Sequence, residues 1–260
     1  MLLSYITTES NGTLTLDQLL RGPLSLSARE VREAKRLGLT VDGAPFFANQ
    51  RIGAGRTVAI PLAEYDMPTD FSAPAEVDIL YQDDALIAVR KPAPLQVHPS
   101  PSAPRGADTL EGRVQSYLRS GAHPVHRLDA ETTGIVLFAK LPYVQAHIQR
   151  QMQADTFRKE YLALVCGVLP DSEGVIDAPI DRVAPDSFTR AVLPGGQRAV
   201  TRYRVEAALR DISLVRLFPV TGRTHQLRVH MAHIGHPLLG DTRYFTAESA
   251  NLAAQYLSLI

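Results

Sequence analysis

Hydrophobic positions in this chain fall mainly into short runs and alternations, and only rarely into helical stripes. Residues 134–139 form a continuous apolar run, as a buried strand does. Val144, Ile148 and Met152 lie four apart after Pro142, which predicts one face of a helix. Further strands are predicted at residues 77–81, 85–89, 161–165, 201–205, 212–218 and 226–229. Strands outnumber helices, so we expect an α+β fold with a mixed, largely antiparallel sheet.

Two helix starts are predicted from capping boxes, in which two side chains each bond the other's backbone. Ser27 followed by Glu30 opens a helix that should end near Gly38. Asp108 followed by Glu111 predicts a second such start. The first of these helices carries four basic residues spaced to share much of one surface, Arg29, Arg32, Lys35 and Arg36.

The N-terminal part of the chain has the pattern of a small unit of its own. A short strand and turn at residues 39–43 and a strand at residues 58–60 follow the first predicted helix. The segment 61–74 contains three prolines among small and acidic residues, which is typical of a linker. We therefore expect a small module at residues 1–70 and a larger domain at residues 71–260.

Composition excludes several classes of protein. No stretch reaches the roughly 18 apolar residues of a membrane span, and the N-terminus lacks a secretory signal pattern. We therefore expect a cytoplasmic protein that does not contact a membrane. The single cysteine, Cys166, excludes a disulfide framework and a cysteine-based zinc site. Its apolar surroundings predict a buried side chain.

Charge is balanced over the whole chain but uneven along it. The 27 basic residues equal the 27 acidic ones, which argues mildly against a nucleic-acid partner. Residues 198–230, however, contain seven arginines against two acidic residues, a local net charge of +5. Arginine makes planar, two-pronged contacts with phosphate, so this segment favours an RNA partner. The alternative, that the arginines only reflect codon usage, stays open.

A few polar residues lie where they could carry chemistry. Asp129 sits in a polar loop before the apolar run at residues 134–139, where a strand can support a carboxylate at a cleft. Arg127 lies beside it. Tyr161 begins a strand and could stack on an extruded base, or fill the edge of the core. Arg228 follows a turn and could keep a neighbouring carboxylate ionised. Each residue has an ordinary alternative as a turn, core or surface residue.

Three histidines, His230, His233 and His236, recur at a spacing of three. A zinc helix usually presents histidines four apart with a glutamate beside the first, and here Gly235 and Pro237 break a helix. We expect histidines that are satisfied by hydrogen bonds or that touch RNA, and no metal site.

Taken together, these stretches resemble the RluA-type family of RNA pseudouridine synthases. Four patterns of the family match this chain in order. Residues 126–140 match H-R-L-D-x-x-T-S/T-G-hydrophobic-L-F-A-K, and residues 159–167 match K-x-Y-hydrophobic-A-hydrophobic-hydrophobic-x-G. Residues 221–230 match T-G-R-T/S-H-Q-I/L-R-V-H, and residues 235–241 match G-H-P-I/L-x-G-D. An earlier piece, residues 79–99, matches the family's I-L-Y-E-D segment and the K-P that follows. The N-terminal unit resembles a small RNA-binding module shared with a small-subunit ribosomal protein.

The resemblance implies a pseudouridine-synthase fold with flanking helices and a central cleft, plus a small α/β module. It implies Asp129 as the nucleophile, Arg228 as its ion-pair partner and Tyr161 as the residue stacked on the base. The carboxylate attacks the anomeric carbon, and the detached uracil rotates and rejoins through carbon 5, with no cofactor. The residues expected to contact RNA are His126, Arg127, Arg223, His225, Arg29, Arg32, Lys35 and Arg36.

The resemblance also orders the possible partners. Ribosomal RNA, of the large subunit first, is the expected substrate, with transfer RNA as the alternative, and the protein is taken to be a monomer. A non-catalytic RNA-binding factor for ribosome assembly is the alternative to an enzyme. A zinc-dependent hydrolase built on the three histidines is the alternative from another class.

Overall fold

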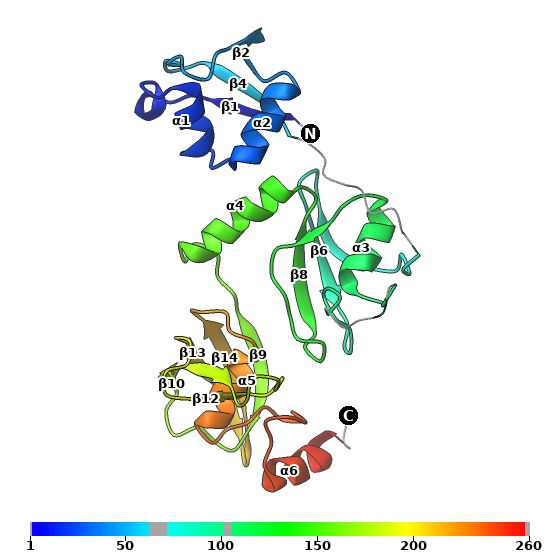
Figure 1. The fold of residues 1–260 in the computed structure, drawn as a ribbon. Helices are drawn as coiled ribbons and strands as arrows, with labels where there is room; N and C mark the ends of the chain where they lie inside the picture. The colour runs from blue at the N-terminus through cyan, green and yellow to red at the C-terminus, as the bar shows by residue number, and fades with distance from the viewer. Residues whose placement is uncertain (1, 63–71, 101–103, 105, 258–260) are drawn as a thin grey trace. The chain divides into compact units, whose positions relative to one another are not determined.

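The computed structural model describes residues 2–62, 72–100, 104 and 106–257 and has an α+β architecture (Figure 1). The chain forms two compact units, one ending at Gln153 and the other beginning at Ala154. Every strand pair between the named strands of the described residues is antiparallel. The expected α+β class with a largely antiparallel sheet is therefore confirmed. None of the helices within the described ranges is long and apolar enough to span a bilayer.

The first unit begins with a four-stranded sheet and two helices. The elements are β1 (Leu2–Ile6), a 3-10 turn (Glu9–Asn11), α1 (Leu16–Arg21), α2 (Ala28–Arg36), β2 (Thr40–Val41), β3 (Ala44–Pro45) and β4 (Thr57–Pro61), with strand order β1-β4-β2-β3. The capping box at α2 is confirmed, because the Ser27 hydroxyl accepts from the Glu30 amide at 3.2 Å and the Glu30 carboxylate accepts from the Ser27 amide at 2.7 Å. Leu37 caps the helix, and Gly38 follows at φ +92°.

The second part of this unit is another four-stranded sheet with one helix. Its elements are β5 (Asp78–Gln82), β6 (Leu86–Lys91), α3 (Leu110–Leu118), β7 (His123–Pro124) and β8 (Gly134–Ala139), in the order β5-β6-β8-β7. Cross-strand neighbours Ile87 and Phe138, and Val89 and Val136, are all fully buried on one face. Ile135 on the other face is 60% exposed. This alternation makes β8 a rigid support for the loop that precedes it.

The predicted start of α3 is wrong by one residue. Thr109, and not Asp108, caps the helix, with its hydroxyl accepting from the Gly112 amide at 3.2 Å. The Asp108 carboxylate instead pairs with the guanidinium of Arg113. A basic residue five positions away competes for the carboxylate, which the three-residue spacing of a capping box does not register.

Helix α4 (Pro142–Gln153) is the helix predicted from the four-residue spacing. Leu141 belongs to the hydrophobic core of the N-terminal sheet, and Tyr143 and Val144 pack against that core. The Tyr143 hydroxyl also donates to the Leu24 carbonyl at 3.0 Å. The predicted boundary between residues 70 and 71 stays a prediction, and its linker at residues 61–74 lies mostly outside the described residues.

The second unit is a four-stranded sheet with a separate hairpin and two helices. Its elements are β9 (Tyr161–Cys166), β10 (Glu173–Asp177), β11 (Ile180–Arg182), β12 (Arg190–Val192), β13 (Val200–Leu209), β14 (Ile212–Pro219), α5 (Gln226–His233) and α6 (Ala247–Leu257). The sheet order is β10-β13-β14-β9 (Figure 1). Outside this sheet, β11 pairs with β12. Val165, Val215 and Leu217 of the sheet and Met231 of α5 form its fully buried core. Cys166 is a buried free thiol, as expected, and burial raises its pKa.

The strand predicted at residues 226–229 is wrong, because this segment begins helix α5. Leu227 and Val229 alternate with polar residues over four positions, which fits a strand. The buried residues of α5 are in fact Gln226, Val229, His230 and Met231, and the first of them lies three and four positions before the next two, as on a helix. A four-residue window is too short to separate the two periods.

We expect Ser27→Ala to lower the free energy of unfolding by about 1 kcal/mol, because the change removes the cap of α2. Ser172→Ala, at an exposed serine outside any helix, is the matched control and should change it by less than about 0.5 kcal/mol. Urea unfolding of both variants makes the comparison. Equal midpoints would show that the cap contributes nothing.

Candidate active site

The loop between β7 and β8 presents Asp129 from a short, well-anchored turn. Leu128 is 8% exposed and fixes the loop to the core. Asp129 is half-buried, and its carbonyl accepts from the Thr132 amide at 3.1 Å, which closes the turn. Arg127 is exposed, while the His126 Nε2 atom accepts from the Leu137 amide of β8 at 3.3 Å. The turn therefore holds the Asp129 backbone in place beside a cation that is open to solvent.

Lys91 holds this turn to the interior of the first unit. Its side chain is fully buried, and its ammonium donates to the carbonyls of Pro92 (2.8 Å), Leu95 (2.6 Å) and Ala130 (2.7 Å). Three donors thus meet three acceptors, which satisfies the buried ammonium. Burial lowers the pKa of Lys91, and the charges of Glu131 and Asp129 raise it in opposition. The end of β6 and the Asp129 turn are consequently held by one buried cation.

His98 is a neighbour of this loop to which the sequence patterns assigned no role. Burial lowers the pKa of its imidazole, and the positive charge of Arg127 lowers it further. A neutral ring beside Arg127 can act as a hydrogen-bond acceptor at neutral pH. His98 lies in the segment that resembles the family, so its position was visible in the sequence but its electrostatic interaction with Arg127 was not.

Arg228 is the best-held cation of the second unit. Its Nε and Nη2 atoms donate to the two Asp241 carboxylate oxygens at 2.7 and 2.9 Å, and the side chains are 12% and 3% exposed. The guanidinium also lies 5.2 Å from the centre of the Tyr244 ring. Burial raises the pKa of Asp241, but hydrogen bonds from Arg228 and from the amides of Arg243 and Tyr244 outweigh this and leave it below its usual value. A paired carboxylate and an aromatic face together fix the orientation of Arg228.

The turn before α5 is built around the buried side chain of Gln226. Its carbonyl oxygen accepts from the Thr221 hydroxyl at 2.7 Å and from the Arg223 amide at 2.9 Å. Its amide donates to the Val200 carbonyl at 2.9 Å and to the Thr201 hydroxyl at 3.0 Å. Because all four bonds are made, the side chain of Gln226 ties the turn to β13.

His225 and Tyr244 connect this turn to Arg228. His225 has a left-handed backbone at φ +58° and caps α5, and its Nδ1 atom lies 2.7 Å from the Tyr244 hydroxyl. Arg223 is exposed and donates to the Arg198 carbonyl at 3.0 Å and to the Gln197 side chain at 2.9 Å. Two residues with predicted roles, His225 in RNA binding and Arg228 in catalysis, therefore contact the same residue of the second unit, Tyr244.

Tyr161 begins β9 and is half-buried against the core that contains Met231 of α5. Lys159, two residues earlier, is also half-buried, and burial lowers the pKa of its ammonium. A Cβ atom built on Gly222 would lie 3.4 Å from the Lys159 Nζ atom. The motif at residues 159–167 thus meets the turn of the motif at residues 221–230.

His230 and His236 are satisfied by hydrogen bonds, as predicted. The His230 Nε2–H donates to the Ala178 carbonyl at 2.9 Å, so Nδ1 accepts from the Thr201 hydroxyl at 2.9 Å. His230 is fully buried, and burial lowers its pKa. His236 donates to the Cys166 carbonyl at 2.9 Å. Within the described ranges, no group of three His, Cys, Asp or Glu side chains is arranged to hold a metal ion.

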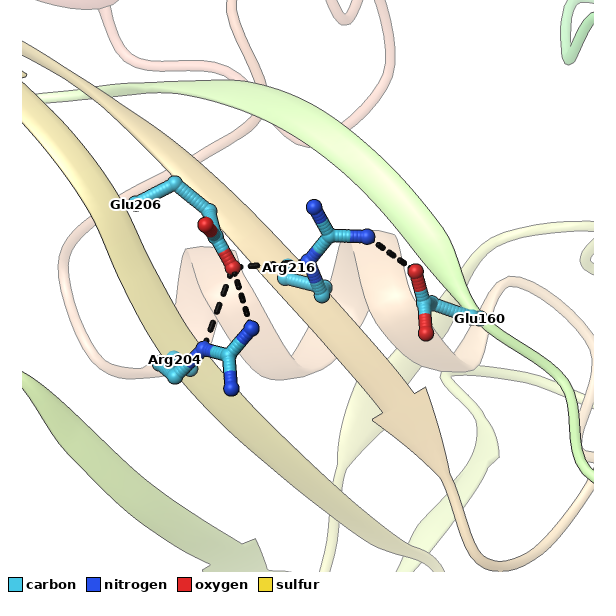
Figure 2. Close-up of polar contacts among 4 residues, drawn as sticks. All are labelled: Glu160, Arg204, Glu206 and Arg216. Carbon is cyan, nitrogen blue, oxygen red and sulfur yellow. Dashed lines mark hydrogen bonds and ion pairs between the residues drawn. The ribbon is translucent and has the colours of Figure 1, made fainter.

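The predicted basic surfaces are only partly available for RNA. On α2 all four basic residues are exposed, but Lys35 pairs with Asp17 and Arg36 with Glu33. In the arginine-rich segment, Arg204 and Arg216 both pair with Glu206, and Arg216 also pairs with Glu160 (Figure 2). Glu206 is already counted in the net charge of +5. Glu160 and Asp241 lie outside residues 198–230 and pair with Arg216 and Arg228, so the value of +5 overstates the charge that this segment offers a phosphate.

The predicted catalytic residues divide between the two units, with Asp129 in the first and Tyr161 and Arg228 in the second. Their meeting in one site stays a prediction. Sequence patterns missed Lys91 and the residues that orient Arg228. The signal for Lys91 was a lysine closing an apolar strand directly before Pro92. The signal for Asp241 was a carboxylate at the end of the last matched motif.

Comparison with known proteins identifies the class. Residues 85–233, more than half of the chain, match the family described as RNA pseudouridylate synthase. Two human structures share the fold. The first, RNA Pseudouridylate Synthase Domain Containing 1, has a TM-score of 0.57 and 26% sequence identity, and the match covers 70% of this chain and 74% of that one. The second, RNA Pseudouridylate Synthase Domain Containing 4, has a TM-score of 0.54 and 31% sequence identity, and the match covers 65% of this chain and 69% of that one. The chain belongs to this family.

Two curated relatives narrow the comparison. A Bacillus subtilis (strain 168) protein named "Uncharacterized RNA pseudouridine synthase YhcT" is 36% identical over 75% of this chain and 67% of its own length. The Haemophilus influenzae "Ribosomal large subunit pseudouridine synthase D" is 38% identical over 75% of this chain and 61% of its own length. The protein is an RNA pseudouridine synthase of the RluA type, an isomerase.

We expect Lys91→Met to lower the free energy of unfolding by about 2 kcal/mol or more, because three carbonyls at the Asp129 turn lose their donor. Lys140→Met, at a lysine bonded to one carbonyl near the surface, should cost less than about 1 kcal/mol. Urea unfolding compares the two. A Lys91→Met protein as stable as the Lys140→Met protein would refute the anchoring role.

Acid should destabilise the second unit through His230. The pKa of its buried ring is lowered from 6.5, so the unfolded chain takes up a proton at a pH where the folded chain does not. The stability contributed by the neutral ring is fully present above pH 6.5 and is lost as the pH falls toward the folded-state pKa. As the pH is lowered from about 7.5 to 5, the thermal unfolding midpoint should fall less steeply in His230→Gln than in the wild type or in His147→Gln. Parallel curves would contradict this.

Proposed function

We propose that the protein converts specific uridines of large-subunit ribosomal RNA to pseudouridine. The observation that carries this proposal is the similarity of the chain to relatives named for the large ribosomal subunit, together with the match of the family across residues 85–233. The chain spans 61% of the length of the Haemophilus relative. The substrate named for that protein is therefore a proposal for this chain, which the experiments below test.

Asp129 is proposed as the nucleophile. One carboxylate oxygen attacks carbon 1 of the target ribose as the bond to uracil N1 breaks, and the electron pair leaves with the uracil as an anion. The uracil turns, and its carbon 5 attacks the same ribose carbon, which breaks the bond to the carboxylate and regenerates Asp129. The carbon 5 proton then leaves to solvent or to a protein base, and N1 takes up a proton, which gives the neutral product. This is covalent catalysis by a carboxylate, as in retaining glycosidases.

The local structure around Asp129 supports this role. A nucleophilic carboxylate must remain ionised while half-buried, which requires nearby positive charge. Lys91 raises the local positive potential from the core side, and its own pKa responds to Asp129. The bonds of Lys91 and Leu95 to the Ala130 carbonyl, at 2.7 and 3.1 Å, hold the backbone next to Asp129. A fixed backbone lowers the entropy cost of aligning the oxygen with its target.

Arg228 and Tyr161 are proposed to complete the site. Arg228 would neutralise Asp129 in the RNA-bound enzyme, and its two hydrogen bonds to Asp241 fix the orientation of the guanidinium. Tyr161 would stack on the extruded uracil, with its ring supported by the core under β9. Arg127 is open to solvent and can fill the space left by the flipped nucleotide.

The N-terminal sheet and helices are proposed to bind RNA through α2. Arg29 and Arg32 are exposed on the same helix surface as Lys35 and Arg36. Two of these four cations are already balanced by carboxylates, so the expected contribution is a small number of phosphate contacts.

Replacing Asp129 by Asn should abolish catalysis, because the amide is not a nucleophile of comparable strength. The assay measures release of tritium from an RNA transcript labelled at uridine carbon 5, since each new carbon bond displaces that hydrogen. Glu131→Gln removes one charge from the same loop and should leave release within about threefold of the wild type. Release by the Asn variant at the wild-type rate would exclude Asp129 as the nucleophile.

Cells that lack the gene should lose one or more pseudouridines from large-subunit ribosomal RNA. Pseudouridine mapping of ribosomal and transfer RNA, with and without a plasmid copy of the gene, makes the measurement. Complementation by the Asp129→Asn variant should fail. Loss of sites from transfer RNA alone would replace the proposed substrate, and loss of none would remove the support for either.

A further inference from the structure

Two arginines face each other across the hairpin of β11 and β12. The strand register pairs Arg182 directly with Arg190, and the neighbouring pair is Ile180 with Val192. Alternation along a strand places these two pairs on the same face. Ile180 and Val192 pack with Val229 of α5 in a hydrophobic cluster, while at the end of the hairpin Arg190 is half-buried and Arg182 is exposed. Two like charges directly opposite one another are unfavourable unless a negative charge lies between them.

The second unit also contains a cross-strand arginine pair that is neutralised. Arg204 and Arg216 are opposite each other on β13 and β14, and both donate to the Glu206 carboxylate (Figure 2). Glu160 binds Arg216 from the other side. Across the residues described, by contrast, no carboxylate forms an ion pair with Arg182 or Arg190. The hairpin therefore lacks the paired carboxylate that the neighbouring four-stranded sheet supplies to Arg204 and Arg216.

A small polar cavity lies where this counter-charge would sit. It has a volume of about 170 Å³ and is lined by Arg182 and Arg190 from the hairpin and by Arg223 and Thr224 from the turn before α5. Asp181 also lines it, so three arginines and one acidic residue surround the cavity. Pockets for drug-sized ligands hold roughly 300 to 1,000 Å³, so this cavity suits a single small group.

The walls of the cavity are held in place before any ligand binds. Arg223 is fixed by the Arg198 carbonyl at 3.0 Å and the Gln197 side chain at 2.9 Å, and Arg182 donates to the Pro185 carbonyl at 2.7 Å. These bonds use only some of the five donors of each guanidinium. The Arg190 amide donates to the Tyr244 hydroxyl at 3.0 Å, and the same tyrosine lies against Arg228.

We propose that this cavity binds one backbone phosphate of the RNA substrate, with Arg182 and Arg190 as its principal ligands and Arg223 as the third. The assignment rests on the proposed action on RNA. Guanidinium groups bind phosphate in a planar, two-pronged manner, and three of them around one small cavity select a phosphodiester over a neutral group. Tyr244 bonds both the Arg190 amide and His225, and its ring lies against Arg228. RNA bound in the cavity is therefore held at a fixed position relative to Arg228.

The test uses the double variant Arg182→Gln/Arg190→Gln in the full-length Asp129→Asn protein, so that turnover does not consume the RNA. The probe is an in vitro transcript of large-subunit ribosomal RNA, and its affinity is measured at several salt concentrations. We expect binding about tenfold weaker or more, and a salt slope reduced by roughly one, as for the loss of one phosphate contact. Arg90→Gln removes an exposed arginine paired with Asp78 and should change neither value.

A second measurement excludes a purely structural role. Inorganic phosphate should raise the thermal unfolding midpoint of the wild-type protein and not that of the double variant. In buffer without phosphate the double variant should be at least as stable as the wild type, because a like-charge pair has been removed. A large drop in its midpoint, or RNA affinity and salt slope equal to those of the parent, would overturn the proposal.

The test of the phosphate cavity can fail or succeed independently of the test of the proposed function. Tritium release by the wild-type protein from the same transcript tests the choice of substrate. Release that is normal in an Arg182→Gln/Arg190→Gln enzyme with an intact Asp129, at subsaturating RNA, rejects the phosphate cavity alone. Absence of release from the wild type, with binding that still depends on both arginines, rejects the substrate and supports the cavity.

Discussion

The buried ammonium of Lys91 is the interaction on which the catalytic half of the first unit depends. A charge in the protein interior costs several kcal/mol unless its hydrogen-bonding groups are all matched. Three carbonyls meet this demand, and one of them belongs to Ala130, next to Asp129. The geometry of the strand end and that of the Asp129 turn therefore cannot vary independently. The loop has no regular structure, yet it is placed by a bond that would be costly to break.

The second unit orients its own cation by a different device. Arg228 is held by both oxygens of Asp241 and by the face of Tyr244, while the buried chain Gln226–Thr201–His230–Ala178 ties α5 to the sheet. Because every polar group of that chain has a partner, the helix keeps a single register against β13. Lys91 in one unit and Arg228 in the other thus show the same principle, in which a buried or half-buried cation is fixed by fully matched acceptors.

The arginines of this protein differ by what faces them. Arg204 and Arg216 face carboxylates and contribute a neutral surface on the outer side of their sheet (Figure 2). Arg182 and Arg190 face each other around a small cavity and leave it positive. A chain with a net charge of zero can in this way bind a polyanion, because the carboxylates cancel the arginines at one place and not at another.

The sequence by itself determined much of the local structure through short-range rules, although the capping rule placed the start of α3 at Asp108 in place of Thr109. Examples are the capping box at Ser27 and Glu30, the strand at residues 134–139, and the motifs that carry the family and with it the class of enzyme. It was wrong at residues 226–229, where a helix and a strand bury residues at periods that four positions cannot separate. It also could not find the partners of Lys91, Arg228 or the Arg182–Arg190 pair. The Lys91–Ala130 and Arg228–Asp241 bonds join residues 39 and 13 positions apart, and the Arg182–Arg190 pair depends on strand register. Only the tertiary structure brings such groups together, because burial and pairing are properties of the packed chain.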